Sequence, residues 1–362
     1  MLPQMLTRSV HICRTRPAEG SPHGKTYCNN SPMSTFQRQY VKDIGKPSEP
    51  ADKISVIGTG QVGLACCAFL IDRRLAQHLV MVDLRKEWVE AEALDFLHAS
   101  SLLASPKIET CSDANCTAGS KYVIITAGTR PAGKSRLDIA KDTLKILSKL
   151  VPKLVESSPD ATFVISSNPA DVMTWAVRRI SGLPKERCIS SGCHLDSMRF
   201  RYLLAQRLGV AASEVNAFIV GEHGDSSVPV WSGVTVGGIA LMRIIPNIGT
   251  DQDQDKWQQV HTDVVKGGRA VSKVKGYTNW AVSLAVVDII QAMMTNSGRI
   301  LSVGTDVQGL MGVEDSVVMS LPCILGTHGV QKVLELPLTE FEMNLFEKST
   351  EALFGAQCAL NL

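Results

Sequence analysis

The sequence predicts an α/β protein in which a doubly wound parallel sheet is followed by a mixed α+β domain. From residue 53 onward, short continuous apolar runs alternate with helical stretches. This alternation is typical of parallel strands that are buried on both faces and joined by crossover helices. Beyond about residue 190 the alternation becomes irregular, and glycine-rich and long helical stretches replace it. The second half is therefore expected to be a separate, mixed unit.

The elements of the first half are expected in alternating order. Each expected strand is a short apolar run bounded by turn residues, and these runs cover Ile54–Ile57, Leu79–Val82, Tyr122–Thr126 and Phe163–Ser166. The helical stretches between them include Lys86–His98 and Leu137–Val155, and in the second of these apolar residues recur near the helical period. Later helices are expected at Trp280–Met294 and Glu340–Ala359.

Residues 1–50 differ in composition from the rest and are expected to form a partly disordered tail. They hold six of the 16 prolines, and seven basic against three acidic residues. Acid-poor N-termini that carry arginines are also typical of organelle transit peptides, so mitochondrial targeting is the alternative interpretation.

The overall composition excludes several classes of protein. The 37 basic and 35 acidic residues nearly cancel, which gives no reason to expect a nucleic-acid or membrane-surface partner. No run of 18 apolar residues occurs, so a membrane-spanning helix is not expected. The ten cysteines are scattered without a Cys-x-x-Cys pair, which fits neither a zinc site nor a disulfide framework. We expect no metal, and reduced thiols in the cytoplasm.

A glycine motif follows the first expected strand. Gly58, Gly60 and Gly63 form G-x-G-x-x-G and open an apolar helical stretch, the context that a Rossmann-type dinucleotide site requires. The glycines would allow a tight turn, close approach of a pyrophosphate, and close packing of helix on strand. Asp83, 20 residues after Gly63, follows the second strand, where a carboxylate can bind the ribose hydroxyls of NAD. The motif therefore predicts NAD binding.

A second phosphate-binding motif competes with the first. Residues 128–135 match G-x-x-x-x-G-K-[ST], in which Lys134 would bind nucleotide phosphates and Ser135 would hold Mg²⁺. The next buried strand ends in Ser-Ser-Asn and offers no aspartate for magnesium. We therefore keep nucleotide hydrolysis only as a minor alternative.

Six motifs together resemble the lactate/malate dehydrogenase family over about residues 50–362. They are the glycine turn, residues 126–136, residues 167–171, residues 191–201, residues 221–233 and residues 275–280. The run Gly-Glu-His-Gly-Asp-Ser-Ser-Val-Pro-Val-Trp-Ser-Gly at 221–233 favours the L-lactate branch. The resemblance implies hydride transfer between NAD and a small 2-hydroxy or 2-keto acid.

The resemblance also implies roles for four residues. His223 would be the general acid and base, because imidazole titrates near working pH. Asp196 would orient His223 and stabilise its imidazolium. Arg199 would bind the substrate carboxylate through a two-point fork. Arg136 would reach substrate from a closing loop and polarise its carbonyl group, a catalytic and a binding role at once.

Three further residues are assigned by resemblance alone. Asn168 would touch substrate and nicotinamide, Thr278 would line the substrate pocket, and Arg130 would face the cofactor. The structural alternatives stay open: Asp196 and Arg199, three residues apart, could form an ordinary helix-surface ion pair, and Asn168 and Thr278 could be turn residues.

The substrate loop departs from the family pattern. Pro131 follows Arg130 where a glutamine is usual, and one residue is missing before Ser135. Proline removes an amide donor, and a misplacement of about 1 Å can cost about a hundredfold in rate. Gly267 and Gly268 also stand where the family has a closely packed helix, at roughly 1 kcal/mol each relative to alanine. The chain is therefore interpreted as a diverged paralogue.

These departures leave three hypotheses for function. The first is an NAD-dependent L-2-hydroxy acid dehydrogenase that interconverts L-lactate and pyruvate. The second is the same reaction on another 2-keto acid, and the third is an NAD-binding paralogue of low activity. The expected domains are a tail at 1–50, a dinucleotide-binding domain at 51–190 and a substrate domain at 191–362. The resemblance further implies a homotetramer.

Overall fold

The computed structural model describes residues 52–129, 133 and 135–362. The first half alternates strands with helices: β1 (Lys53–Ile57), α2 (Gln61–Asp72), β2 (His78–Val82), α3 (Lys86–His98), β3 (Lys107–Cys111), β4 (Tyr122–Ile125), α4 (Arg136–Ser157), β5 (Thr162–Ile165), α5 (Ala170–Ser181) and β6 (Cys188–Ser190). The expected tail at 1–50 lies outside the described residues. The predicted α/β class is confirmed, and the four predicted strands correspond to β1, β2, β4 and β5.

The second half mixes helices with antiparallel strands. Its longer elements are α6 (His194–Leu208), α8 (Gln258–Lys275), α9 (Trp280–Met294), β12 (Ile300–Asp306), β13 (Val318–Gly326), β14 (Gly329–Val333) and α10 (Glu340–Cys358). Its shorter elements are β7 (Val215–Asn216), β8 (Ile219–Val220), β9 (Val228–Pro229), β10 (Thr235–Val236), β11 (Ile239–Ala240) and α7 (Leu241–Ile244). The glycine pair 267–268 lies inside α8, so the helix forms despite the propensity cost of two glycines.

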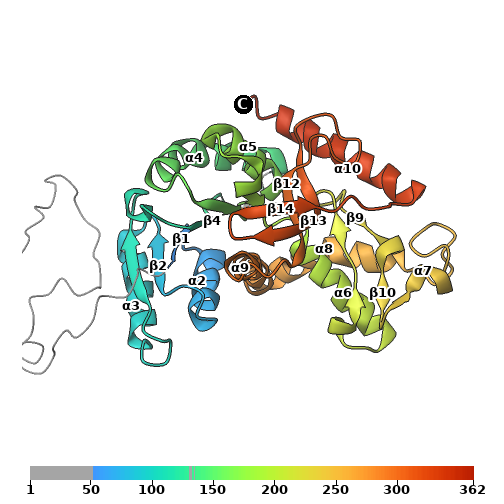
Figure 1. Cartoon of the computed structure of the whole chain (residues 1–362), viewed down its shortest axis with the longest axis horizontal. Helices are drawn as coiled ribbons and strands as arrows, with labels where there is room; N and C mark the ends of the chain where they lie inside the picture. The colour runs from blue at the N-terminus through green and yellow to red at the C-terminus, as the bar shows by residue number, and fades with distance from the viewer. Residues whose placement is uncertain (1–51, 130–132, 134) are drawn as a thin grey trace, which may run out of the picture.

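One nine-stranded sheet runs through the molecule, in the order β14-β13-β12-β6-β5-β4-β1-β2-β3. Strands β1 to β6 are parallel, and β12 pairs with β6 in antiparallel fashion through Gly304 and Ser190. Helices α4, α5 and α10 cover one face and α2, α3 and α9 the other (Figure 1). The sheet therefore crosses residue 190, and the boundary between the domains 51–190 and 191–362 stays a prediction.

Burial explains the pattern of the parallel strands. Every residue of β4 and β5 is buried, because helices cover both faces of the sheet there. The edge strand β3 alternates buried with half-exposed residues, and β6 has only three residues. Neither forms a continuous apolar run, which explains why the sequence pattern did not predict them.

The cysteines differ from the expectation in one place. Cys111, at the end of β3, and Cys116, in the loop that follows, are joined in a disulfide. The expectation of reduced thiols throughout is therefore wrong for this pair, which the short β3–β4 connection brings together. Of the free cysteines within the described residues, Cys358 is exposed and the others are buried. Within the same residues, no helix is both long enough and apolar enough to span a bilayer.

Candidate active site

The predicted site residues of the first half follow the carboxyl ends of neighbouring parallel strands. Gly58 follows β1, Asp83 follows β2, and Asn168 comes shortly after β5. Because the carboxyl ends of parallel strands meet at one edge of a sheet, these residues lie along a single rim. β4 lies beside β1, where the strand order reverses, so the rim includes the switch point at which open α/β sheets bind ligands.

The glycine turn has the close contacts that its sequence predicted. Gly58 has a φ of +90°, and a Cβ there would lie 2.7 Å from the backbone of Ala127. A Cβ at Gly63 would lie 2.0 Å from the carbonyl oxygen of Gly58, so only glycine lets α2 pack against the turn. Around Gly60, by contrast, the space for a Cβ is open among the described residues. Gly60 is the N-cap of α2 and no side chain caps it, which leaves amides of the first turn for a pyrophosphate.

Asp83 is held at the end of β2 by a set of donors. Its Oδ2 accepts the backbone N–H of Thr59 at 3.0 Å and the Thr59 hydroxyl at 3.2 Å. The Arg85 guanidinium donates to both carboxylate oxygens, at 3.0 and 3.1 Å. Burial would raise the pKa of Asp83, but the hydrogen bonds from Arg85 and Thr59 outweigh it and lower the pKa. Asp83 is therefore a fixed, ionised acceptor beside the glycine turn.

His223, Asp196 and Arg199 form one hydrogen-bonded cluster. Asp196 lies in the first turn of α6 and is 4% exposed. Its Oδ2 lies 2.5 Å from Nδ1 of His223, and its Oδ1 accepts from Nη1 of Arg199 at 2.9 Å. The carboxylate thus bridges an imidazole and a guanidinium that lie 24 residues apart in the chain. A surface ion pair, the structural alternative for Asp196 and Arg199, does not describe this buried cluster.

The charges in this cluster set the protonation of His223. The negative charge of Asp196 raises the pKa of His223, against the opposing effect of burial. Burial would raise the pKa of Asp196, but the imidazole of His223 and the guanidinium of Arg199 lower it overall. The arrangement therefore favours a proton on His223 and none on Asp196, which is what an acid supported by an orienting carboxylate needs.

Arg136 also reaches this cluster. It is the first residue of α4, and its side chain is 48% exposed. Nη2 donates to the carbonyl oxygen of His223 at 3.3 Å, and Nη1 lies 3.0 Å from a carboxylate oxygen of Glu222. A Cβ at residue 224 would lie 2.6 Å from Nη2, so Gly224 leaves the space that this approach requires.

The remaining predicted residues are less well defined by contacts. Asn168 is exposed and precedes a cis bond to Pro169, and Thr278 lies partly buried between α8 and α9. Arg130, like Pro131 and Lys134, lies outside the described residues. Ser135, the other residue of the competing phosphate loop, caps α4: its hydroxyl accepts from the Asp138 amide and donates to the Asp138 carboxylate.

Two acidic residues in the site received no role from the sequence. Asp171, in the first turn of α5, accepts the backbone N–H of His223 at 2.7 Å. Glu222 accepts from the Ser226 hydroxyl at 2.6 Å and pairs with Arg136. Asp171 lies in the motif at residues 167–171, and Glu222 lies in the motif at residues 221–233. The presence of an acidic side chain in such a motif was the only signal in the sequence that could have indicated a role for either residue. Among the described residues, no group of three or more His, Cys, Asp or Glu side chains could hold a metal ion.

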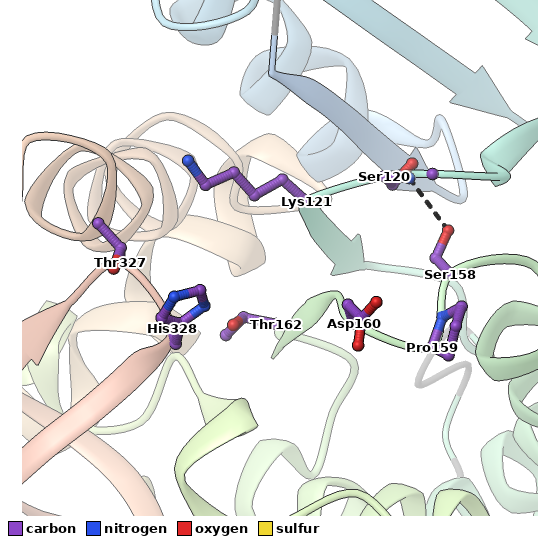
Figure 2. Close-up of a pocket in the computed structure, with 9 residues that line it drawn as sticks. Ser120, Lys121, Ser158, Pro159, Asp160, Thr162, Thr327 and His328 are labelled. Atoms are coloured by element: carbon purple, nitrogen blue, oxygen red, sulfur yellow. Dashed lines mark hydrogen bonds between the residues drawn. The ribbon is translucent and has the colours of Figure 1, made fainter.

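A cavity of about 290 Å³ lies elsewhere, at the amino ends of β4 and β5 (Figure 2). Lys121, Ser158, Asp160 and His328 lie around it. The Ser158 hydroxyl already donates to the Thr117 carbonyl oxygen, and Lys121 pairs with Asp52. The cavity is at the opposite edge of the sheet from His223, and it is not part of the candidate active site.

Comparison with known proteins identifies the family of this chain. Residues 52–190 match the lactate/malate dehydrogenase NAD binding domain, and residues 193–356 match the alpha/beta C-terminal domain of the same family. The chain is 44% identical over 332 residues to the L-lactate dehydrogenase A chain of Ambystoma mexicanum, covering 91% of this chain and all of the relative. It is 42% identical over 328 residues to the B chain of Mus musculus, covering 90% and 98%.

The two matched domains together span nearly all of the described residues and leave no support for the nucleotide-hydrolase alternative. The open space at Gly60 and the uncapped start of α2 fit the cofactor that the first domain binds. The chain belongs to the lactate/malate dehydrogenase family and is an NAD-dependent oxidoreductase of the lactate dehydrogenase type.

Proposed function

We propose that this protein interconverts L-lactate and pyruvate, with His223 as the general acid and base. The observation that carries the proposal is the 2.5 Å contact between His223 and Asp196 beside Arg199. The curated relatives in Ambystoma mexicanum and Mus musculus, both L-lactate dehydrogenases, support the choice of substrate.

The bound cofactor would supply a hydride to C2 of the keto acid. His223 uses Nδ1 for Asp196, so Nε2 is the nitrogen that gives its proton to the carbonyl oxygen. The keto acid thereby gains a hydride and a proton and leaves as the hydroxy acid. Asp196 stays ionised and stabilises the imidazolium before the proton leaves. In the reverse direction the neutral imidazole takes the hydroxyl proton.

The two arginines would recognise the acid substrate. Arg199 uses Nη1 for Asp196, and a guanidinium has further N–H donors that can bind a carboxylate. Arg136, near the backbone of His223, would polarise the carbonyl group. Asn168 and Thr278 are proposed to contact substrate. Gly58, Gly60, Gly63, Asp83, Asn168 and Arg130 are proposed to bind the cofactor.

A panel of 2-keto acids tests the proposal. NADH oxidation, followed by absorbance, should be fastest with pyruvate, and His223→Asn should abolish it while the variant still binds NADH. If no keto acid is reduced although NADH binds, the third hypothesis, an NAD-binding paralogue of low activity, replaces the proposal.

A second candidate is the same reaction on a bulkier 2-keto acid. The observation that favours it is the position of Gly267 and Gly268 on α8, because a Cβ at either residue would lie 3.5 Å from the Arg199 side chain. Neither residue places a side chain beside the proposed carboxylate anchor. A higher kcat/KM for a larger keto acid than for pyruvate would establish this alternative, and Gly268→Ala should then reverse the preference.

We also propose a homotetramer in the cytoplasm. Val274 and Trp280, around the α8–α9 junction, are 90% and 57% exposed, and this apolar surface is the candidate subunit interface. Light scattering during size exclusion would give the mass of four chains, and a monomeric mass would contradict the proposal.

A further inference from the structure

A second buried carboxylate, from the first half of the chain, contacts the backbone of His223. Asp171 is 2% exposed and lies in the first turn of α5, within the segment that matches the NAD binding domain. Its Oδ2 accepts the His223 backbone N–H at 2.7 Å, and its Oδ1 accepts the Ser190 hydroxyl at 2.7 Å. The hydrogen bond to His223 spans 52 residues of sequence.

The surroundings hold this carboxylate in one position. Ser190, at the end of β6, also accepts the backbone N–H of Gly192 at 3.0 Å. On the other side, a Cβ at Gly304 of β12 would lie 2.9 Å from Oδ1 of Asp171 and 2.6 Å from Cβ of Ser190. The junction of β6 with β12 therefore fits tightly around Asp171, and glycine at 304 is required by that fit.

We propose that Asp171 is a second positioning carboxylate for His223: it fixes the His223 backbone to α5 and adds a negative charge that stabilises the imidazolium. Asp196 orients the ring, whereas Asp171 fixes the main chain that carries the ring. The inference rests on the proposed acid–base role of His223. It gives Asp171, in the segment that matches the NAD binding domain, a part in the chemistry of His223, which lies in the segment that matches the C-terminal domain.

The charges around His223 decide the direction of the effect. Asp196 and Arg199 face it from α6, Arg136 from α4, Glu222 from its own loop, and Asp171 from α5. Asp225, on the same loop as His223, pairs with Arg136 and Arg269. Burial lowers the pKa of His261 to about 4 and raises that of Cys193 well above its usual value, so these two groups are neutral. Burial raises the pKa of Asp171 to about 6, so the carboxylate is charged at neutral pH. Removing that charge should lower the pKa of His223.

The test is a histidine NMR titration of the full chain, with the His223 signal assigned through His223→Asn. Asp171→Asn keeps the shape of the side chain, and its amide can still accept the His223 N–H and donate to Ser190. We expect the His223 midpoint to fall by roughly one pH unit, because a nearby opposite charge shifts a pKa by about that amount or more. The control Ser190→Ala keeps the carboxyl group but removes a hydrogen bond that lowers the pKa of Asp171, so the His223 midpoint should fall by less than in Asp171→Asn. An unchanged midpoint in Asp171→Asn, or an equal fall in both variants, would overturn the inference.

Kinetics supply a second, independent measurement. We expect Asp171→Asn to lower kcat for pyruvate reduction up to about tenfold at neutral pH, because a lower pKa of His223 leaves less of the acid protonated, while the KM for NADH changes little. Ser190→Ala, which removes one of the hydrogen bonds that hold the carboxylate, is the second variant should Asp171→Asn fail to fold, and it should lower kcat by a smaller factor. A kcat for Asp171→Asn or for Ser190→Ala equal to that of the unaltered protein would contradict the positioning role. The NMR titration needs no turnover, so a failure of the proposed function can be told apart from a failure of this inference.

Discussion

The glycine turn after β1 and the loop that carries His223 are built in different ways. The turn combines a local contact between Gly58 and Gly63 with contacts to Asp83 and Ala127, which follow the two strands beside β1, and it presents backbone amides. The His223 loop is held by the side chains of Asp171 of α5, Asp196 of α6 and Ser349 of α10, and by backbone hydrogen bonds between Gly221 and Ser320 of β13. The difference teaches that cofactor binding can be altered locally, whereas the acid–base group depends on the packing of the whole molecule.

A substitution of His223 is expected to have the largest effect, on kcat and not on NADH affinity, and so to distinguish the His223 loop from the glycine turn. His223→Asn removes the proton donor and should lower kcat by about 10²–10⁴-fold, the usual contribution of general acid catalysis. The affinity for NADH should change little, because the turn at Gly58–Gly63 is untouched. Steady-state kinetics and a fluorescence titration with NADH measure the two quantities. A comparable loss of NADH affinity would show that the regions are not separable in this way.

Arg199→Lys should affect the substrate more than the cofactor. Lysine keeps the charge but loses the fork that can hold both Asp196 and a carboxylate. A hydrogen bond to a charged group contributes about 1.5–3 kcal/mol, so we expect kcat/KM for pyruvate to fall roughly tenfold to a hundredfold. Unaltered kcat/KM for pyruvate would refute the role of Arg199 as carboxylate anchor.

Substitutions in the glycine turn, by contrast, should affect the cofactor more than the substrate. Gly63→Ala places a methyl group 2.0 Å from the Gly58 carbonyl oxygen, and the overpacking should cost about 1–3 kcal/mol of stability and weaken NADH binding. Gly60→Ala is the matched control, because its Cβ has open space around it. We expect Gly60→Ala to keep the melting temperature while it weakens NADH binding. Equal melting temperatures for both variants would argue against the close packing of α2 on the turn.

The smallest effect concerns pH. Asp196 raises the pKa of His223 above its ordinary value, so the protonated form persists to a higher pH than in an unperturbed histidine. Pyruvate reduction needs that proton and should decline as pH rises through the raised pKa, whereas lactate oxidation should increase over the same range. The interaction with Asp196 stabilises the folded protein fully at a pH below the pKa that histidine has in the unfolded chain. This stabilisation is lost as the pH rises through the raised pKa of His223. Parallel pH profiles for the two directions would be inconsistent with His223 as the acid and base.

The same contrast explains what the sequence could predict. The turn at Gly58–Gly63 and Asp83 follow apolar strands at short range, so spacing alone predicted them. His223, Asp196 and Arg199 were found through the family resemblance, and their contacts required the fold. Asp171 received no role because its hydrogen bond to His223 joins α5 to a loop beyond β8, which no periodicity reveals. The edge strand β3 was missed because it is half-exposed, and the interior strand β6 because it has only three residues.

A crystal structure with NADH and a non-reactive pyruvate analogue tests the central claim most directly. We expect the carboxylate of the analogue to bind Arg199 and its carbonyl-like oxygen to lie within hydrogen-bond distance of Nε2 of His223. The nicotinamide ring should face the analogue from the rim beyond Gly58. An analogue bound away from His223, or a nicotinamide that does not reach it, would contradict the account.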